Sequence, residues 1–376
     1  MIAISSSNDQ IVYGGPDGYC YVQEISEAGP SSERKTTKLN GHVGDVLDVK
    51  WFPSGQASDS NLHMAEPELT SCLSAMQPQV VLTASSDATV RIFSSSSGVN
   101  PRTLTGHKRA VTSVAILGIG KNVLSGSKDG SLKLWDVGAG KCISTMYNKS
   151  FVGVEAIAMG QDATSFRGAI RSRLVVTQPE SESDLPPEGN FEHKHMDGEV
   201  DEDTRDKIAF AGLSSGSGLL AAFDLGSKGP IIEAFPHIPA AASSIPAERR
   251  GGAIHAVAYD SKNRLLASGS AKGVVVIRNT RTMTVKGDSS DFRIFSRSQA
   301  AITSLTFVTT EAGVDLVVTT ASGLPYRVKI SPDGSEPVSV LEEYAGWEAV
   351  PVNSVAVGSG EGNVWLAGGE GGVRRY

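Results

Sequence analysis

Three residues of the types that hydrolases use in catalysis lie within a short stretch of the chain: Ser125, His107 and Asp129. A serine hydroxyl can act as a nucleophile, a histidine as its general base, and a carboxylate as the group that orients the histidine. A second set of the same kind occurs earlier in the chain: His42, Thr83 and Asp87. A catalytic trio should be unique, so this partial repetition favours a structural role over catalysis.

Other chemical signals are weaker. Two glycine-rich stretches, 216–218 and 368–372, neither open a helix after a strand nor carry the Lys-Ser/Thr of a phosphate-binding loop, so we interpret them as turns. His193 and His195 lie among carboxylates and could hold a metal, but no helix fixes their spacing. The 3 cysteines are far apart and form no C-x-x-C motif. The sequence therefore predicts a protein that is not an enzyme, with no catalytic, cofactor or metal site.

The composition narrows the class of protein further. The chain has 376 residues and a net charge of −7, from 41 acids and 34 bases, which argues against a nucleic-acid partner bound by a broad basic surface. The first ten residues do not resemble a secretory signal, and no apolar run approaches the roughly 18 residues of a membrane helix. We expect a cytoplasmic and nuclear protein without a membrane partner.

A repeated unit accounts for the positions of these residues. Its clearest copy begins at Gly106-His107, turns at Asp129-Gly130 and closes at Trp135-Asp136. Alternating apolar stretches occupy three segments between these landmarks: 111–116, 122–127 and 131–136. This pattern predicts a meander of short antiparallel strands.

The same rhythm recurs along the whole chain, which predicts a single domain over 1–376. The approximate repeats are 1–38, 39–103, 104–149, 150–252, 253–299, 300–350 and 351–376. Two loop insertions interrupt them, at 56–79 and 179–206. The second carries eleven acids and two bases, a composition that predicts disorder. It is either a solubilising loop or a docking site for a basic partner.

Gly-His and Trp-Asp at this spacing, with an Asp-Gly turn between them, resemble the WD-repeat β-propeller family. The resemblance implies an all-β fold of seven blades, each a four-stranded antiparallel sheet. It leaves open whether the first and last blades are complete. It also implies a buried hydrogen-bonded tetrad of His107, Ser125, Asp129 and Trp135. A second tetrad would contain His42, Thr83 and Asp87, with Phe93 in place of the tryptophan.

Finer matches resemble the proteasomal ATPase-associated factor family. They are Gly-His-Val-Gly-Asp-Val at 41–46, Phe-Pro-Ser-Gly at 52–55, Gly-His-Lys at 106–108 and Gly-Val-Arg-Arg-Tyr at 372–376. This resemblance implies a non-catalytic adaptor, monomeric when free. Such an adaptor assembles the base of the 26S proteasome 19S regulatory particle by binding the C-terminal domain of an ATPase subunit.

The resemblance also implies that the partner binds the upper face, formed by the loops before each first strand and the turns between second and third strands. Acidic side chains there would contact a basic partner: Asp45, Asp48, Glu342, Glu343 and Glu348. Trp347 would serve as an aromatic anchor. Lys108, Arg109 and Lys128 also fall on upper loops, and Arg374 and Arg375 could pair with acids inside the last blade.

Two other functions remain open from the sequence. A WD-repeat scaffold of another complex, such as a ubiquitin-ligase substrate receptor or a ribosome-assembly factor, would share the same fold. A propeller enzyme would require repeated Asp-box or cofactor motifs, which the sequence does not contain.

Overall fold

The computed structural model describes most of the chain. The described residues are 1–25, 35–53, 79–148, 151–161, 163–168, 204–242, 244–284, 291–310, 313–331, 336–347, 349–358, 363–369 and 371–376. Insertion 56–79 therefore lies outside them except for Gln79, and insertion 179–206 lies outside them except for its last three residues. The regular structure is almost entirely β, as predicted.

The third sheet shows how the repeat forms its strands. Its order is β12-β11-β10-β9, all antiparallel neighbours. The strands are β9 (Val111–Leu117), β10 (Asn122–Ser127), β11 (Ser131–Asp136) and β12 (Lys141–Tyr147). β10 is buried along its whole length while β12 is mostly exposed. Each sheet therefore needs neighbours for its inner strands and presents its outermost strand to the outside.

Six further sheets repeat this plan. The first contains β1 (Ile2–Ile4), β2 (Gln10–Gly14), β3 (Cys20–Glu24) and β4 (Thr36–Leu39). The second contains β5 (Val46–Trp51), β6 (Val80–Ser85), β7 (Thr89–Ser94) and β8 (Arg102–Thr105). The fourth contains β13 (Val154–Gln161), β14 (Lys207–Leu213), β15 (Leu219–Asp224) and β16 (Gly229–Pro236).

The remaining sheets complete the chain. The fifth contains β17 (Ile254–Asp260), β18 (Leu265–Ser270), β19 (Val275–Asn279) and β20 (Phe292–Phe295). The sixth contains β21 (Ile302–Thr310), β22 (Gly313–Thr320), β23 (Tyr326–Ile330) and β24 (Ser339–Glu343). The seventh contains β25 (Val352–Val357), β26 (Val364–Gly368) and β27 (Val373–Arg375). Two short 3-10 helices, η2 (Ala247–Arg249) and η3 (Thr280–Thr282), flank the fifth sheet.

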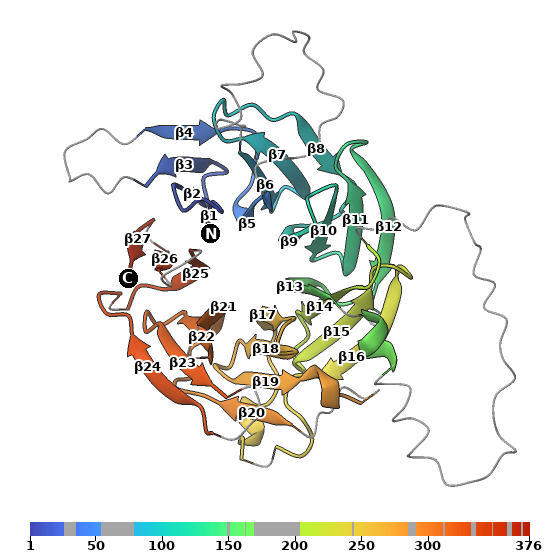
Figure 1. Cartoon of the computed structure of the whole chain (residues 1–376), viewed down its shortest axis with the longest axis vertical. Coiled ribbons are helices and arrows are strands. Elements are labelled where there is room, and N and C mark those ends of the chain that lie inside the picture. The colour runs from blue at the N-terminus through green and yellow to red at the C-terminus, as the bar shows by residue number, and fades with distance from the viewer. Residues whose placement is uncertain are drawn as a thin grey trace, which may run out of the picture.

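The seven sheets stand in a ring, with the first strand of each facing the centre and the last facing outwards (Figure 1). The predicted seven-bladed β-propeller is thus confirmed, and we number the blades in chain order. The first blade has four strands, although β1 is only three residues long. The seventh has three among the described residues, so only this blade has fewer than four described strands.

The hydrophobic core lies between neighbouring blades. Six clusters of buried side chains join blades 1 to 2, 2 to 3, 3 to 4, 4 to 5, 5 to 6 and 6 to 7. Within the described part of the chain, no such cluster joins blade 7 to blade 1. There the backbone amide of Ile2 donates a hydrogen bond to the Ser354 hydroxyl, at 3.3 Å. The ring is therefore closed mainly by its inner strands at this seam.

The two insertions lie between the first and second strands of their blades, between β5 and β6 and between β13 and β14. The end of the second one is ordered: the Asp206 carboxylate accepts a hydrogen bond from the backbone amide of Thr164, at 2.6 Å. Asp206 thereby holds the start of a helical turn at 163–168, which the sequence analysis did not predict. The ends of β5 and β13 from which the insertions depart lie on the lower face, opposite the upper loops.

Candidate functional site: the upper face of the ring

His107 is the centre of a buried hydrogen-bond chain in blade 3. Its Nε2 lies 2.7 Å from the Ser125 hydroxyl and its Nδ1 lies 3.0 Å from the Asp129 carboxylate. The Trp135 indole N–H donates to the Ser125 hydroxyl at 2.8 Å. These contacts match the arrangement that the resemblance implied for this blade.

Burial and hydrogen bonding determine the protonation states of His107 and Asp129. Burial lowers the pKa of His107 more than the hydrogen bond to Asp129 raises it, so the imidazole is neutral at pH 7. Burial opposes ionisation of Asp129, but hydrogen bonds from Ser131, the Lys108 amide and His107 outweigh it and lower the carboxyl pKa to about 2. Nδ1–H therefore donates to Asp129, and Nε2 accepts from Ser125.

A catalytic use of these residues conflicts with their burial. Ser125 is fully buried, and its oxygen already contacts His107 and Trp135. A substrate therefore has no path to the hydroxyl, and the chain of bonds satisfies buried polar groups instead. Among the described residues, no group of three or more His, Cys, Asp and Glu could hold a metal ion, and His193 and His195 lie outside that part of the chain. No described helix is long and apolar enough to cross a membrane.

Blade 2 repeats the arrangement without the indole donor. His42 Nδ1 lies 2.9 Å from the Asp87 carboxylate and Nε2 lies 2.8 Å from the Thr83 hydroxyl. The ring of Phe93 lies 6.3 Å from the imidazole at an interplanar angle of 64°. The corresponding values for His107 and Trp135 are 6.0 Å and 64°, so Phe93 keeps the packing and loses only the hydrogen bond.

A third buried histidine that bonds a hydroxyl of its blade was not predicted from the sequence. His237 lies before blade 5, and its Nδ1 lies 2.9 Å from the hydroxyl of Ser268, while Nε2 lies 3.2 Å from the carbonyl oxygen of Val274. Burial lowers its pKa to about 3, and the charge of Arg278 adds to this effect. The signal was the Ala-Ser-Gly-Ser stretch at 267–270, which resembles Leu-Ser-Gly-Ser at 124–127.

The tetrads hold the upper loops in place. Asp129 accepts a hydrogen bond from the backbone amide of Lys108 at 2.9 Å, and Asp87 accepts one from that of Val43 at 3.1 Å. Both residues directly follow the tetrad histidine, and their side chains are exposed. The upper face is thus a set of rigidly held, outward-facing side chains, which suits binding of another protein.

The predicted acidic contacts of blade 2 separate into two cases. Asp45 is exposed in the loop before β5, and its carbonyl oxygen accepts a hydrogen bond from the Ser86 amide at 2.9 Å. Asp48 was placed on an upper loop, and that placement is wrong, because it lies within β5. Its carboxylate accepts hydrogen bonds from the Ser113 hydroxyl at 3.2 Å and the Val114 amide at 2.9 Å, and so joins blade 2 to blade 3.

Glu342 and Glu343 lie at the end of β24, the outermost strand of blade 6, rather than in the loop that follows. Their side chains are 54% and 61% exposed. Glu342 lies 3.7 Å from an Arg327 nitrogen, and Glu343 accepts a hydrogen bond from Arg297. Glu348 lies outside the described residues.

The expectation that Trp347 is an exposed anchor is wrong. Trp347 is 3% exposed and belongs to the core between blades 6 and 7. Arg374 lies over its ring and Arg375 lies over the ring of Trp365, and within the described ranges neither arginine forms an ion pair with an acid. Trp347 follows Gly346 in the loop before blade 7, where the blade 2 and blade 3 loops have Gly-His. It therefore supports the loop from inside.

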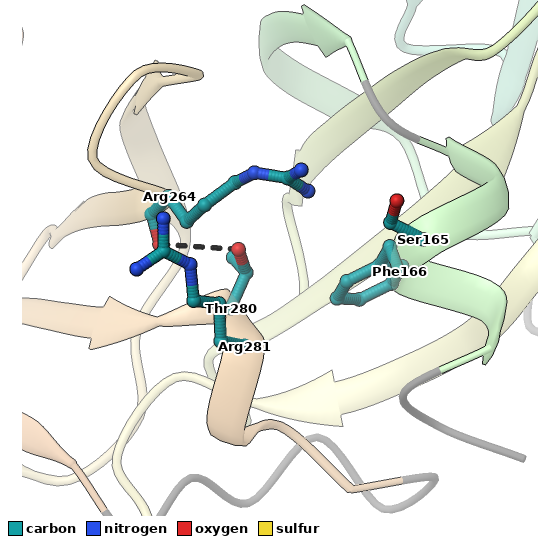
Figure 2. Close-up of a pocket in the computed structure, with 5 residues that line it drawn as sticks. All are labelled: Ser165, Phe166, Arg264, Thr280 and Arg281. Atoms are coloured by element: carbon teal, nitrogen blue, oxygen red, sulfur yellow. Dashed lines mark hydrogen bonds between the residues drawn. The ribbon is translucent and has the colours of Figure 1, made fainter. Parts of the chain in front are cut away.

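A pocket of about 230 Å³ lies on the lower face of the ring, between blades 4 and 5. Its lining residues are Ser165, Phe166, Arg264, Thr280 and Arg281 (Figure 2). The Thr280 hydroxyl donates to the Arg264 carbonyl oxygen at 3.1 Å, and the Arg264 side chain extends across the pocket towards the helical turn that carries Phe166. None of the sequence-predicted site residues lines it.

Comparison with known proteins agrees with this geometry. The family described as "WD domain, G-beta repeat" matches residues 33–94 and 98–136. The chain is thus a seven-bladed β-propeller that contains WD repeats at these residues. Proteins of this class are scaffolds that bind other proteins.

Several curated proteins are similar over part of their length. "WD repeat-containing protein 37" of Xenopus laevis is 29% identical over 178 residues, 42% of this chain and 36% of the relative. "26S proteasome regulatory subunit RPN14" of Saccharomyces cerevisiae is 36% identical over 120 residues, 31% of this chain and 23% of the relative. "SIR4-interacting protein SIF2" of the same yeast is 29% identical over 130 residues, 35% of this chain and 19% of the relative.

These matches are partial. The chain spans about a third of the length of the WD repeat-containing protein 37 relatives that it matches, 36% and 31% in the first two. The resemblance to a proteasome-associated WD-repeat protein is confirmed over these 120 residues. The partner that this chain binds does not follow from that resemblance.

Proposed function

We propose that this scaffold is a non-catalytic assembly chaperone of the 26S proteasome regulatory particle. It binds the C-terminal domain of a proteasomal ATPase subunit, is monomeric when free, and acts in the cytoplasm and nucleus. The observation that carries the proposal is the 36% identity to the 26S proteasome regulatory subunit RPN14 over 120 residues.

The exposed acids support a basic partner. Glu342 and Glu343 are more than half exposed; Glu343 pairs with the partly exposed Arg297, and Glu342 lies 3.7 Å from Arg327 and accepts a hydrogen bond from the Tyr344 hydroxyl at 3.3 Å. Exposed ion pairs contribute about 0.2–1 kcal/mol each, so a cationic side chain of a partner can replace Arg297 beside Glu343 at little cost. Asp45 adds an exposed carboxylate on blade 2.

These acids lie on opposite sides of the seam. Asp45 belongs to blade 2, and Glu342 and Glu343 belong to blade 6, so blades 1 and 7 stand between them (Figure 1). One partner domain in contact with both groups covers the seam as well. Binding to the upper face would then also stabilise ring closure.

Affinity purification from the host followed by mass spectrometry tests the proposal. We expect recovery of regulatory-particle ATPase subunits without the proteolytic core. Recovery of ubiquitin-ligase or pre-ribosomal subunits instead would contradict it and favour a scaffold of another complex.

A charge-reversal set locates the contact. The variant Asp45→Lys, Glu342→Lys, Glu343→Lys should bind the ATPase subunit more weakly and keep its thermal stability. Glu336→Lys is a matched control, because Glu336 is 62% exposed, pairs with Lys329 in the same blade, and precedes β24 on the lower face. Equal loss in both variants would show a nonspecific charge effect.

A further inference from the structure

Two aromatic side chains project where β12 passes into the loop before β13, on the upper face: Tyr147 ends β12 and Phe151 lies in the loop. Phe151 is 69% exposed and Tyr147 is 48% exposed. Their ring centroids lie 5.5 Å apart at an interplanar angle of 49°. Large exposed aromatic groups in contact are typical of sites that bind other proteins.

The loop holds Phe151 in a fixed and strained conformation. Its φ is 49°, a left-handed value that is costly for a bulky side chain. Asn148, which is buried, donates to the carbonyl oxygen of Val152 at 2.7 Å and accepts from the Val152 amide at 3.0 Å. A Cβ on Gly130 would lie 2.8 Å from the Phe151 carbonyl oxygen, so the turn of blade 3 packs directly against this backbone. Little backbone entropy at Phe151 therefore remains to be lost when a partner binds.

Three cations lie beside the aromatic pair, on the neighbouring upper loops of blade 3. Lys108, Arg109 and Lys128 are all exposed. The Lys128 amide donates to the Ala110 carbonyl oxygen at 2.9 Å, and a Cβ on Gly153 would lie 3.1 Å from the Lys128 Cα. The loop at 108–110, the turn at Lys128 and the Phe151 loop are therefore contiguous.

The acids in this region offset only part of the positive charge: Glu155 pairs with Lys128, while Lys108 and Arg109 form no ion pair within the described part of the chain. The Asp129 carboxylate is used by His107, Ser131 and the Lys108 amide. Glu155 is 13% exposed and lies 3.5 Å from the Lys128 ammonium group. A positive, aromatic surface thus occurs on a chain whose net charge is −7.

The geometry points to a binding site for an acidic peptide segment that carries an apolar side chain. We call it the blade 3–4 patch: Tyr147, Phe151, Lys108, Arg109 and Lys128. The apolar side chain packs on Phe151 and Tyr147, and carboxylates bind the three cations. The small number of cations favours a peptide over a nucleic acid, because nucleic-acid affinity depends on many phosphate contacts. The site is independent of the proposed function, which relies on acidic groups of blades 2 and 6.

Fluorescence polarisation with the full chain tests this inference. The probe is a short labelled peptide of Glu and Asp around one central Phe, compared with the same peptide carrying Lys in place of the acids. We expect saturable binding of the acidic probe that weakens as salt is added, since the cations are exposed. The basic probe should not bind.

Two variants separate binding from folding. Phe151→Asn should weaken binding about tenfold or more without lowering thermal stability, because Asn accepts left-handed backbone more readily than Phe. Lys108→Glu with Lys128→Glu should weaken it about tenfold and reverse the salt dependence.

The matched controls are Val43→Ser and Lys141→Glu. Val43 is 92% exposed and follows its tetrad histidine on blade 2, and Lys141 is an exposed lysine at the start of β12. Both controls should bind the acidic probe within about twofold of the unaltered chain. The inference is overturned if the acidic probe does not bind, if Phe151→Asn binds it as well as the unaltered chain, or if a single-stranded oligonucleotide binds the patch more tightly than the peptide.

Discussion

The guanidinium carbon of Arg374 lies 4.8 Å from the centroid of the Trp347 indole ring. The backbone of Gly346 passes against the same guanidinium, and a Cβ there would collide with it. Blade 2 has a related contact, in which a Cβ on Gly41 would lie 2.6 Å from an Arg91 nitrogen. In blades 2 and 7, the glycine of this loop thus lies directly against an arginine from the third strand of the same blade.

Gly346→Ala is expected to destabilise the protein by about 1–3 kcal/mol. Gly346 has a φ of 93°, and its Cβ would also clash with Arg374. Gly371→Ala is the control, since Gly371 has a φ of 79° and open space around its Cα. Urea unfolding should show a clearly larger loss at Gly346. Equal losses would mean that backbone strain alone is responsible.

Trp135→Phe is expected to cost about 1–2 kcal/mol of unfolding free energy, because the buried Ser125 hydroxyl loses its indole donor. Blade 2 folds with Phe93 at the corresponding place, so the variant should retain its fold. Trp365→Phe, at a half-buried tryptophan of blade 7, should cost less. Thermal melting of the two variants measures the difference, and a smaller loss for Trp135→Phe would argue against the tetrad.

Asp48→Ala is expected to cost about 1–3 kcal/mol, because the Val114 amide and Ser113 hydroxyl lose a charged acceptor. Asp45→Ala should change stability by less than about 0.5 kcal/mol, since Asp45 is exposed. Denaturant unfolding separates the two. If Asp48→Ala proves neutral, the carboxylate does not join blades 2 and 3.

Stability is expected to fall as the pH drops below about 6.5. The pKa of His237 is lowered from 6.5 to about 3 in the folded state by burial, and burial also lowers the pKa of His42 and His107. At lower pH the histidines are protonated in the unfolded chain but remain neutral in the folded chain. The free energy of unfolding therefore decreases with falling pH. Unfolding at about pH 7.5 and about pH 5 measures the effect.

The contribution of His237 can be isolated. His237→Gln should show a smaller loss of stability over the same pH interval, because its side chain does not titrate. An identical pH dependence in this variant would assign the effect to other groups.

The sequence predicted what depends on neighbouring residues along the chain. Gly-His, Asp-Gly and Trp-Asp lie within one repeat, so they carried the resemblance that implied the blades and both tetrads. Trp347 was misjudged because its burial depends on packing against Arg374 and Gly368, which belong to later strands. Asp48 was misjudged because its partners lie in the next blade, which strand periodicity does not reveal.

His237 was missed for a related reason. No glycine precedes it and no turn aspartate accepts from it, so the local motif is absent. Its partners are a serine 31 residues later and a backbone carbonyl oxygen 37 residues later. Every residue has a backbone carbonyl oxygen, so the sequence does not indicate which one accepts the hydrogen bond.

The hydrogen bond between the Ile2 amide and the Ser354 hydroxyl can form only late in the synthesis of the chain, so ring closure is the last step of folding. The two residues are 352 positions apart, so at about 5–20 residues per second β1 waits roughly 20 to 70 s for its partner to leave the ribosome. Blades 1 to 6 can pack one after another during that time, since each core cluster joins consecutive blades. The nascent chain is then an open arc whose first blade is still uncovered on one side, and that side is the natural place for a general chaperone to act.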